Sequence, residues 1–183
     1  MFDAESILET INMIKVNNLD IRTVTLSLSL RDCAHSDIKV VGENIRNKIL
    51  KYAKNLYSYA SEIENEYSIP IVNKRIAITP ISLVGESSKD MDYVYLAKVL
   101  DEVASEVNVD FIGGFSALVE KGFTKGDLAL IESIPEALSS TKKICSSINV
   151  ASSKAGINMD AVLKMSKIIK ETANLTAKED GIG

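Results

Sequence analysis

The stretch IRTVTLSLSL, residues 21–30, decides the fold class of this chain. Val24, Leu26 and Leu28 alternate with small hydroxyl residues, which is the period-two pattern of a strand with one buried face. Downstream, apolar residues recur every three or four positions from about Val40 to Asn65, which predicts one long amphipathic helix. A clear strand followed by a long helix indicates an α/β protein.

Strands and helices continue to alternate on both sides of this stretch. We expect a helix from Asp3 to Val16, strands over 69–79, 109–112 and 144–150, a loop over 151–157, helices over 90–107 and 158–173, and two short helices starting near Thr124 and Ser133. This order favours one α/β domain over residues 1–183, with mainly parallel strands joined by right-handed crossovers. Four parallel strands form an incomplete layer, so we expect a homo-oligomer or a missing C-terminal half to complete it.

Composition narrows the possible functions. The chain has 183 residues, 46% of them hydrophobic and 25% charged, which is the usual mix for one folded domain. Its net charge of −4 gives no electrostatic reason to bind nucleic acid. No apolar run reaches the length of about 18 residues that a bilayer span needs. We therefore expect a cytoplasmic protein that binds neither nucleic acid nor membrane.

The supply of cysteine and histidine limits the chemistry further. Cys33 and Cys145 lie too far apart for a CxxC motif, and two cysteines make no disulfide framework, so we expect two free thiols. His35 is the one histidine of the chain. A zinc site or a Ser-His-Asp triad built from these residues alone is therefore not expected. The sequence indicates no particular cofactor.

A basic interruption in an apolar strand is the strongest anomaly. Asn73, Lys74 and Arg75 lie within the isoleucine-rich segment 69–79. Alternation places Asn73 and Arg75 on one face and Lys74 on the other. Arg75 could hold a carboxylate or phosphate by a two-point contact, or it could form an internal ion pair with an Asp or Glu. Both interpretations remain open.

The first predicted strand ends close to a second candidate group. Asp32 and Cys33 follow it, where ligands bind in many parallel α/β proteins. Cys33 could be a nucleophile if a nearby cation lowers its pKa, or a small buried apolar residue. Asp32, Cys33, His35 and Asp37 together match no common metal spacing, so we interpret His35 as a solvated loop residue and predict no metal site.

Two further segments offer polar groups. Gly113 and Gly114 follow a predicted strand and precede an expected helix. Their backbone N–H groups could receive an anion at the N-terminus of that helix, although a tight turn explains the glycines equally well. On the strand over 144–150, alternation places Cys145, Ser147 and Asn149 on one face. That face could orient a small polar ligand with Cys145 as a second candidate thiol, or it could pack against a helix.

Five segments together resemble one known family. They are DIRTVTLSLSLRDC, IPIVNKRIAITPISL, VDFIGGFSALVEKGFTKGD, SIPEALSSTKKICSSINVASSKAGINMDAV and IIKETANLT. On these segments the chain is identified as resembling the PFL-like proteins of bacteria and archaea, also called domain of unknown function 711 or uncharacterised protein family 0210. The resemblance spans residues 20 to 176, and it covers only the front part of the longer family members.

The resemblance implies a fold and leaves the reaction open. It implies half of a ten-stranded β/α barrel similar to that of pyruvate formate-lyase. No glycyl-radical loop of that enzyme class occurs in this chain, so radical chemistry is not inferred. We consider an enzyme that binds a small anionic metabolite in the barrel centre through Arg75 and Asn73, with Cys33 or Cys145 reactive. The alternatives are a ligand-sensing regulatory protein and a structural, oligomerising subunit.

Overall fold

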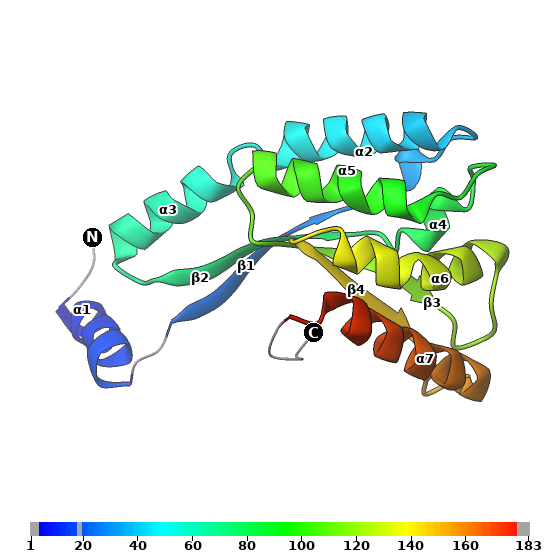
Figure 1. Ribbon diagram of the computed structural model, residues 1–183. Helices are drawn as coiled ribbons and strands as arrows, with labels where there is room; N and C mark the ends of the chain where they lie inside the picture. Colours follow the sequence, from blue (N-terminus) through cyan, green and yellow to red (C-terminus); the bar gives the residue numbers. More distant parts are fainter. Residues whose placement is uncertain (1–3, 18–19, 179–183) are drawn as a thin grey trace.

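The computed structural model describes residues 4–17 and 20–178, which form a parallel four-stranded sheet with helices along one side (Figure 1). The strand order β1-β2-β3-β4 follows the order in the chain. The strands are β1 Ile21–Leu28, β2 Ile71–Ile78, β3 Phe111–Leu118 and β4 Ile144–Asn149. The predicted α/β class, with parallel strands alternating with helices, is therefore confirmed.

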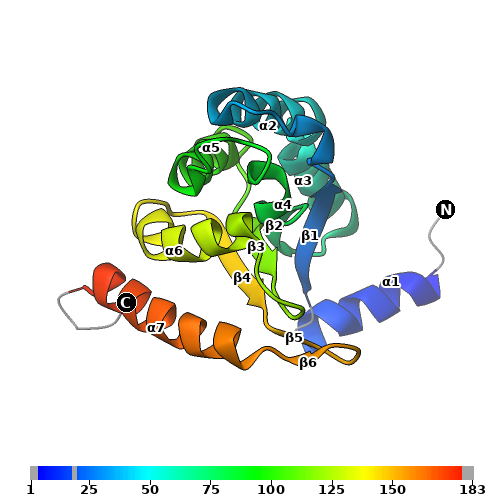
Figure 2. The ribbon, with the colours of Figure 1, turned by 90° about the vertical axis from the view of Figure 1, so that its right-hand side faces the viewer.

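The long helices all lie on the same side of this sheet. They are α2 Ile38–Ala53, α3 Leu56–Tyr67, α5 Tyr93–Glu106, α6 Lys125–Ser139 and α7 Met159–Thr176. Each connects or follows neighbouring parallel strands, and because such crossovers are right-handed, every helix returns on the same face. Figure 2 shows α2, α5, α6 and α7 as an arc around the strands. In the described part of the chain, no helix covers the opposite face of the sheet, which we call the open face.

Alternation along the strands builds the core on the helix side. Ile76, Ile112 and Phe115 are fully buried there, and Ile45 of α2 and Leu100 of α5 pack into the same cluster. Burial of one large apolar side chain contributes about 1.5–3 kcal/mol, so this layer provides most of the stabilisation. The open face carries mostly polar and small residues, together with the exposed apolar side chains of Phe111 and Leu118.

Short elements complete the described chain. They are α1 Ala4–Ile11, a π-helical turn Asn12–Val16, a 3₁₀ turn Arg31–Cys33, α4 Ser82–Gly85, and a hairpin of β5 Ala151–Ser152 and β6 Gly156–Ile157. The N-terminal helix is as predicted from Ala4, whereas its proposed Asp3 cap lies outside the described residues. The sequence predicts a loop over 151–157. In the structure, this segment forms a hairpin of two antiparallel strands with two residues each.

The predicted long helix from Val40 to Asn65 is wrong as one helix. The chain breaks into α2 and α3 at Lys54 and Asn55. The stripe that suggested continuity loses its cover in the second half, because Tyr59 and Ile63 are exposed and only Ala60 of α3 is buried. Periodicity alone did not distinguish a stripe that contacts the core from one that leaves it.

The prediction of two short helices after Thr124 is also wrong. One helix, α6, runs through Pro135, and Thr124 caps it by accepting a hydrogen bond from the Asp127 N–H at 3.1 Å. A proline inside a helix removes one backbone hydrogen bond. Here Leu130, Ile131 and Ile134 are buried on the same face, so packing against the sheet keeps the helix continuous.

The sequence predicts that the third strand stops at Gly113 and Gly114. In the structure, β3 continues through both glycines to Leu118. A β-bulge lies between Gly113 and Phe115, and Gly114 has a φ of 122°. The Gly114 carbonyl accepts a hydrogen bond from the Ile81 N–H at 3.0 Å. No helix begins here, so the helix N-terminus on which the anion interpretation of these glycines depended is absent from this position.

The described residues contain neither a membrane-spanning helix nor a cluster of metal ligands. Among residues 4–17 and 20–178, no helix combines the length and the apolar character needed to cross a membrane. No cluster of three or more His, Cys, Asp or Glu side chains in that part of the chain is placed to hold a metal ion.

The two glycines of the bulge should respond differently to alanine. A Cβ on Gly114 would lie 2.5 Å from Ile78 Cγ1 and 2.6 Å from the Ile78 carbonyl oxygen, whereas one on Gly113 meets nothing within 4 Å. We expect Gly114→Ala to lower the free energy of unfolding by about 2–4 kcal/mol through overpacking and backbone strain. The matched Gly113→Ala variant should change it by less than about 1 kcal/mol. Urea denaturation measures both, and equal effects would contradict the assigned bulge.

Candidate functional site

The strand register divides the candidate residues between the two faces of the sheet. Arg75 pairs with Thr25 on β1 and with Phe111 on β3, and Asn73 pairs with Thr23. These residues lie on the open face, while Lys74 pairs with Val24 and faces the helices. The alternation predicted for the basic triplet therefore holds, and its neighbouring cations have different surroundings.

Lys74 is the member of the triplet that forms an internal ion pair. Its Nζ lies 3.1 Å from the Glu64 carboxylate and donates to the Ile71 carbonyl at 2.7 Å. It also lies 5.6 Å from the centre of the Tyr57 ring. Glu64 accepts a second hydrogen bond from the Ile71 N–H at 2.7 Å, and these contacts hold its pKa below the usual range. Lys74 thus joins α3 to β2 and is not available to a ligand on the open face.

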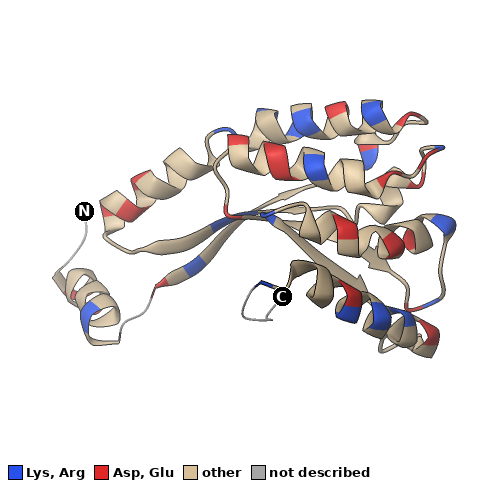
Figure 3. Cartoon of the chain, viewed as in Figure 1, with Lys and Arg blue, Asp and Glu red and all other residues tan. Residues whose placement is uncertain are grey.

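Arg75 has no such partner. It is exposed, and among the described residues it forms no ion pair; its Nη2 contacts the Thr23 hydroxyl at 3.4 Å. None of the four strands contains an Asp or Glu. Figure 3 shows how few charged residues the strands carry in comparison with the helices. The internal ion pair considered for Arg75 is therefore absent from the described structure, and its guanidinium is the one charge at an open-face position of these strands.

A row of small residues crosses the open face beside Arg75. Register places Ser27, Ala77, Gly113 and Cys145 side by side on the four strands. The space above Gly113 is empty, because an added Cβ would contact no atom within 4 Å. From strand spacing and rise, the Cα atoms of Arg75 and Cys145 are about 12 Å apart. A molecule of a few heavy atoms that contacts the Arg75 guanidinium could therefore reach the Cys145 thiol.

Two other candidates on this face lie too far away to share that molecule. Ser147 pairs with Ser116, and Asn149 pairs with Leu118, toward the carboxyl ends of the strands. By the same strand dimensions, Asn149 lies more than about 20 Å from Arg75. The Asn149 amide lies 3.4 Å from the Glu120 carboxylate. The structure thus places Arg75 and Asn149 on one face without bringing them together.

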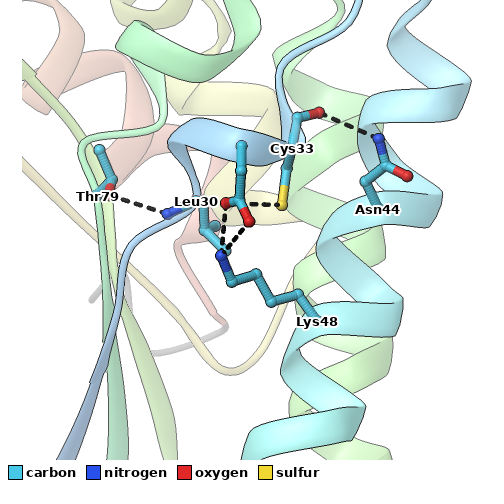
Figure 4. Close-up of polar contacts among 6 residues, drawn as sticks. Leu30, Cys33, Asn44, Lys48 and Thr79 are labelled. Carbon is cyan, nitrogen blue, oxygen red and sulfur yellow. Dashed lines mark hydrogen bonds and ion pairs between the residues drawn. The ribbon is translucent and has the colours of Figure 1, made fainter.

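Asp32 and Cys33 lie elsewhere, between the end of β1 and α2 (Figure 4). Cys33 is buried in the core, its carbonyl accepts a hydrogen bond from the Asn44 amide at 3.4 Å, and its thiol lies 4.0 Å from Asp32. Burial and the negative charge of Asp32 raise the pKa of Cys33. The nucleophile hypothesis required a cation that lowers the pKa of Cys33. Lys48 acts in that direction, but burial and Asp32 outweigh its effect, so the thiolate is disfavoured.

Asp32 itself binds the Lys48 ammonium group. The Lys48 Nζ donates to an Asp32 oxygen at 2.6 Å, which lowers the pKa of Asp32 and raises that of Lys48. Nearby, the His35 carbonyl accepts a hydrogen bond from Ser87, and His35 Nδ1 accepts one from the Asp37 N–H at 3.1 Å. These contacts organise the loop before α2, and none of them faces Arg75.

Sequence reasoning noticed the hydroxyl side chains of β1 but did not include them in the site. Thr23, Thr25 and Ser27 lie on the open face, next to Asn73, Arg75 and Ala77 of β2. Their signal was the polar half of the alternation in residues 21–30. The sequence did not show that β2 lies next to these hydroxyl residues, because alternation does not tell which strand is adjacent.

The chain is similar to known proteins along most of its length. Residues 12–183 match the family described as Uncharacterised ACR (DUF711). A UPF0210 protein of Methanococcoides burtonii is 62% identical over 179 residues, which cover 98% of this chain and 40% of that protein. A UPF0210 protein of Halothermothrix orenii is 59% identical over 183 residues, covering 100% of this chain and 40% of that protein.

A third relative has the same relation in length. The UPF0210 protein of Acetivibrio thermocellus is 60% identical over 176 residues, covering 96% of this chain and 39% of its own length. This chain therefore spans about 40% of the curated relatives that it matches. Because the family match extends from residue 12 to residue 183, this chain belongs to the DUF711 family of uncharacterised proteins.

Proposed function

We propose that the open face of the sheet binds a small anionic molecule, with Arg75 as its anchor. The observation that carries the proposal is an exposed guanidinium that has no acidic partner within residues 4–17 and 20–178, on a face whose strands contain no Asp or Glu. A guanidinium binds carboxylate and phosphate oxygens through two parallel hydrogen bonds. An anion is therefore the ligand class that this face is best equipped to recognise.

Neighbouring groups supply the remaining polar contacts of the proposed site. The hydroxyl groups of Thr23, Thr25 and Ser27 can donate or accept hydrogen bonds. The Asn73 amide donates to the Arg22 carbonyl at 3.1 Å, which leaves its oxygen to accept a hydrogen bond from a ligand. The absence of side-chain atoms above Gly113 leaves room for the ligand body. Uncharged groups around one cation suit a small polar anion better than a large apolar one.

Closure of the sheet into a barrel would give Arg75 a further reason to need an anion. We propose, as the family resemblance implies, that the sheet is part of a ten-stranded barrel whose remainder comes from the longer chain. Closing a barrel would remove the open face from bulk water. A desolvated guanidinium without a partner is costly, so an anion in the barrel centre would then replace the lost water.

Whether the ligand also reacts depends on the thiol at the end of the small-residue row. Cys145 is exposed, whereas Cys33 is buried. We propose Cys145 as the group that would act on a bound substrate if the protein is an enzyme. A ligand-sensing protein would use the same anion site without turnover, and a structural subunit would not need it. The difference between these functions therefore shows at Arg75 and Cys145.

Removing the guanidinium tests anion binding directly. We expect Arg75→Ala to weaken binding of small carboxylates or phosphate about 10- to 100-fold, because a charge-assisted contact contributes about 1.5–3 kcal/mol. Isothermal titration calorimetry at low ionic strength measures this change. Arg46→Ala is the matched control, since it removes the same charge from an ion pair with Glu106 on the helix side. Equal affinities in wild type and Arg75→Ala would exclude the proposed anchor.

Alkylation tests the thiol separately. We expect iodoacetamide to modify the native protein once, at Cys145, and to reach Cys33 only after unfolding, because burial raises the pKa of Cys33. Intact-mass spectrometry counts the adducts, and Cys145→Ser should give none in the native state. An anion that binds at Arg75 should slow the modification of Cys145. Unchanged labelling at saturating anion would separate Cys145 from the site.

A further inference from the structure

An apolar groove runs along the outer edge of the sheet. It lies between β4, α6 and α7 and has a volume of about 630 Å³. Its walls include Ile148 and Val150 from the end of β4, Ile134 from α6, and Met165 and Ile169 from α7. Ile169 is 63% exposed although it is a large aliphatic residue. Apolar surface of this kind on a folded domain marks a contact with another polypeptide segment or a ligand.

One buried polar atom in the same groove lacks a hydrogen bond. This atom is the Ser146 hydroxyl oxygen, which has no hydrogen-bond partner among the described residues. Ser146 also lines the groove, on the helix-facing side of β4. A buried hydroxyl without a partner is costly, so a donor or acceptor on a segment that enters the groove would be stabilised by bonding to it.

The strand that borders the groove is an edge strand. In the part of the chain that the structure describes, β4 pairs with β3 on one side only, so alternate backbone N–H and C=O groups of β4 point away from the sheet. Exposed groups of this type are the template on which a further strand pairs. An extended segment at this edge would bond to β4 and at the same time cover the apolar walls.

Topology indicates the direction of that segment. Every strand of the sheet lies next to its predecessor in the chain, and a helix on the same face precedes each new strand. After β4 comes α7, which packs on α6 and runs back alongside β4 in the opposite direction (Figure 1). A strand that follows α7 would therefore start beside the beginning of β4 and run parallel to it.

We propose that this groove binds a fifth parallel strand, supplied by the part of the longer relatives that follows α7. The inference rests on the continuation of the sheet proposed above and assigns its point of attachment. About 60% of the relatives' length lies outside the segment that this chain matches, so those proteins contain ample sequence for it. The strand would direct apolar side chains toward Met165 and Ile169 and place a polar group beside Ser146.

Reassembly from two pieces tests the proposal. This chain would be co-expressed with the remainder of the Methanococcoides burtonii relative, which is the part of that protein outside the 62% identical segment. We expect the two polypeptides to co-purify, and amide hydrogen exchange in β4 to slow by about tenfold or more relative to this chain alone. Binding of an anilinonaphthalene dye to the groove should disappear in the complex.

A matched pair of substitutions on α7 locates the contact. Ile169 lines the groove, and Leu163 is similarly exposed at 60% but does not line it. Ile169→Glu should abolish co-purification, while Leu163→Glu should leave it unchanged, with thermal unfolding of this chain alone as the check that both variants fold. Failure to co-purify, or equal behaviour of the two variants, would overturn the proposal. So would self-association that protects β4 equally, since a second copy would then occupy the groove.

The outcome is independent of the anion site. Arg75→Ala should co-purify like the wild type, because Arg75 lies on β2 and points to the open face, away from α7. Unchanged anion binding in Arg75→Ala with intact reassembly would contradict only the proposed function, and weakened anion binding with failed reassembly of the wild type would contradict only the fifth strand.

Discussion

The handedness of the crossovers is the constraint on which the rest of the structure depends. Because each connection between parallel strands is right-handed and the strands follow one another in order, every long helix lies on the same face of the sheet. A doubly wound sheet reverses its strand order and thereby covers both faces. In the described part of this chain no such reversal occurs, so one face holds the core and the other exposes the polar halves of the strand patterns.

This constraint gives two adjacent cations opposite roles. Lys74 points into the helix layer, where Glu64 and the Ile71 carbonyl replace its lost water. Arg75, one residue later, points to the open face, where its guanidinium contacts the Thr23 hydroxyl. Burying a charge requires a partner, and the chain provides one on the side that it covers. On the other side, the partner is left to whatever later occupies that face.

Much of the fold could be predicted from local patterns, because alternation and helical periodicity report directly on one buried face. The strand at residues 21–30, the division of Asn73, Lys74 and Arg75 between faces, and the helix that starts near Asn158 are of this kind. The errors arose where tertiary packing outweighed local signals. Pro135 suggested a helix boundary, and a continuous buried stripe kept α6 intact.

The candidate site was harder to predict, because its members come from different strands. Sequence alternation placed Cys145 and Arg75 each on a face of its own strand, but only the register shows that these faces coincide. Cys33 shows the opposite case, since its position after a strand suggested a site and the 3₁₀ turn directs it into the core. The alternation of a strand does not predict the conformation of a three-residue turn that follows it, so the direction of the Cys33 side chain could not be predicted.

The bulge in β3 accommodates one extra residue, Gly114, without a partner on β4. Phe111 and Gly113 belong to the open-face set, so strict alternation would also place Phe115 on the open face. Because the bulge takes up the extra residue, Phe115 faces the core and Ser116 lies on the open-face side. Deleting the extra residue, Gly114, would leave a regular strand with every following side chain on its present face, whereas deleting two residues there would turn them all to the opposite face. Length changes in this strand during evolution should therefore be confined to loss of the extra residue or to the ends of the strand.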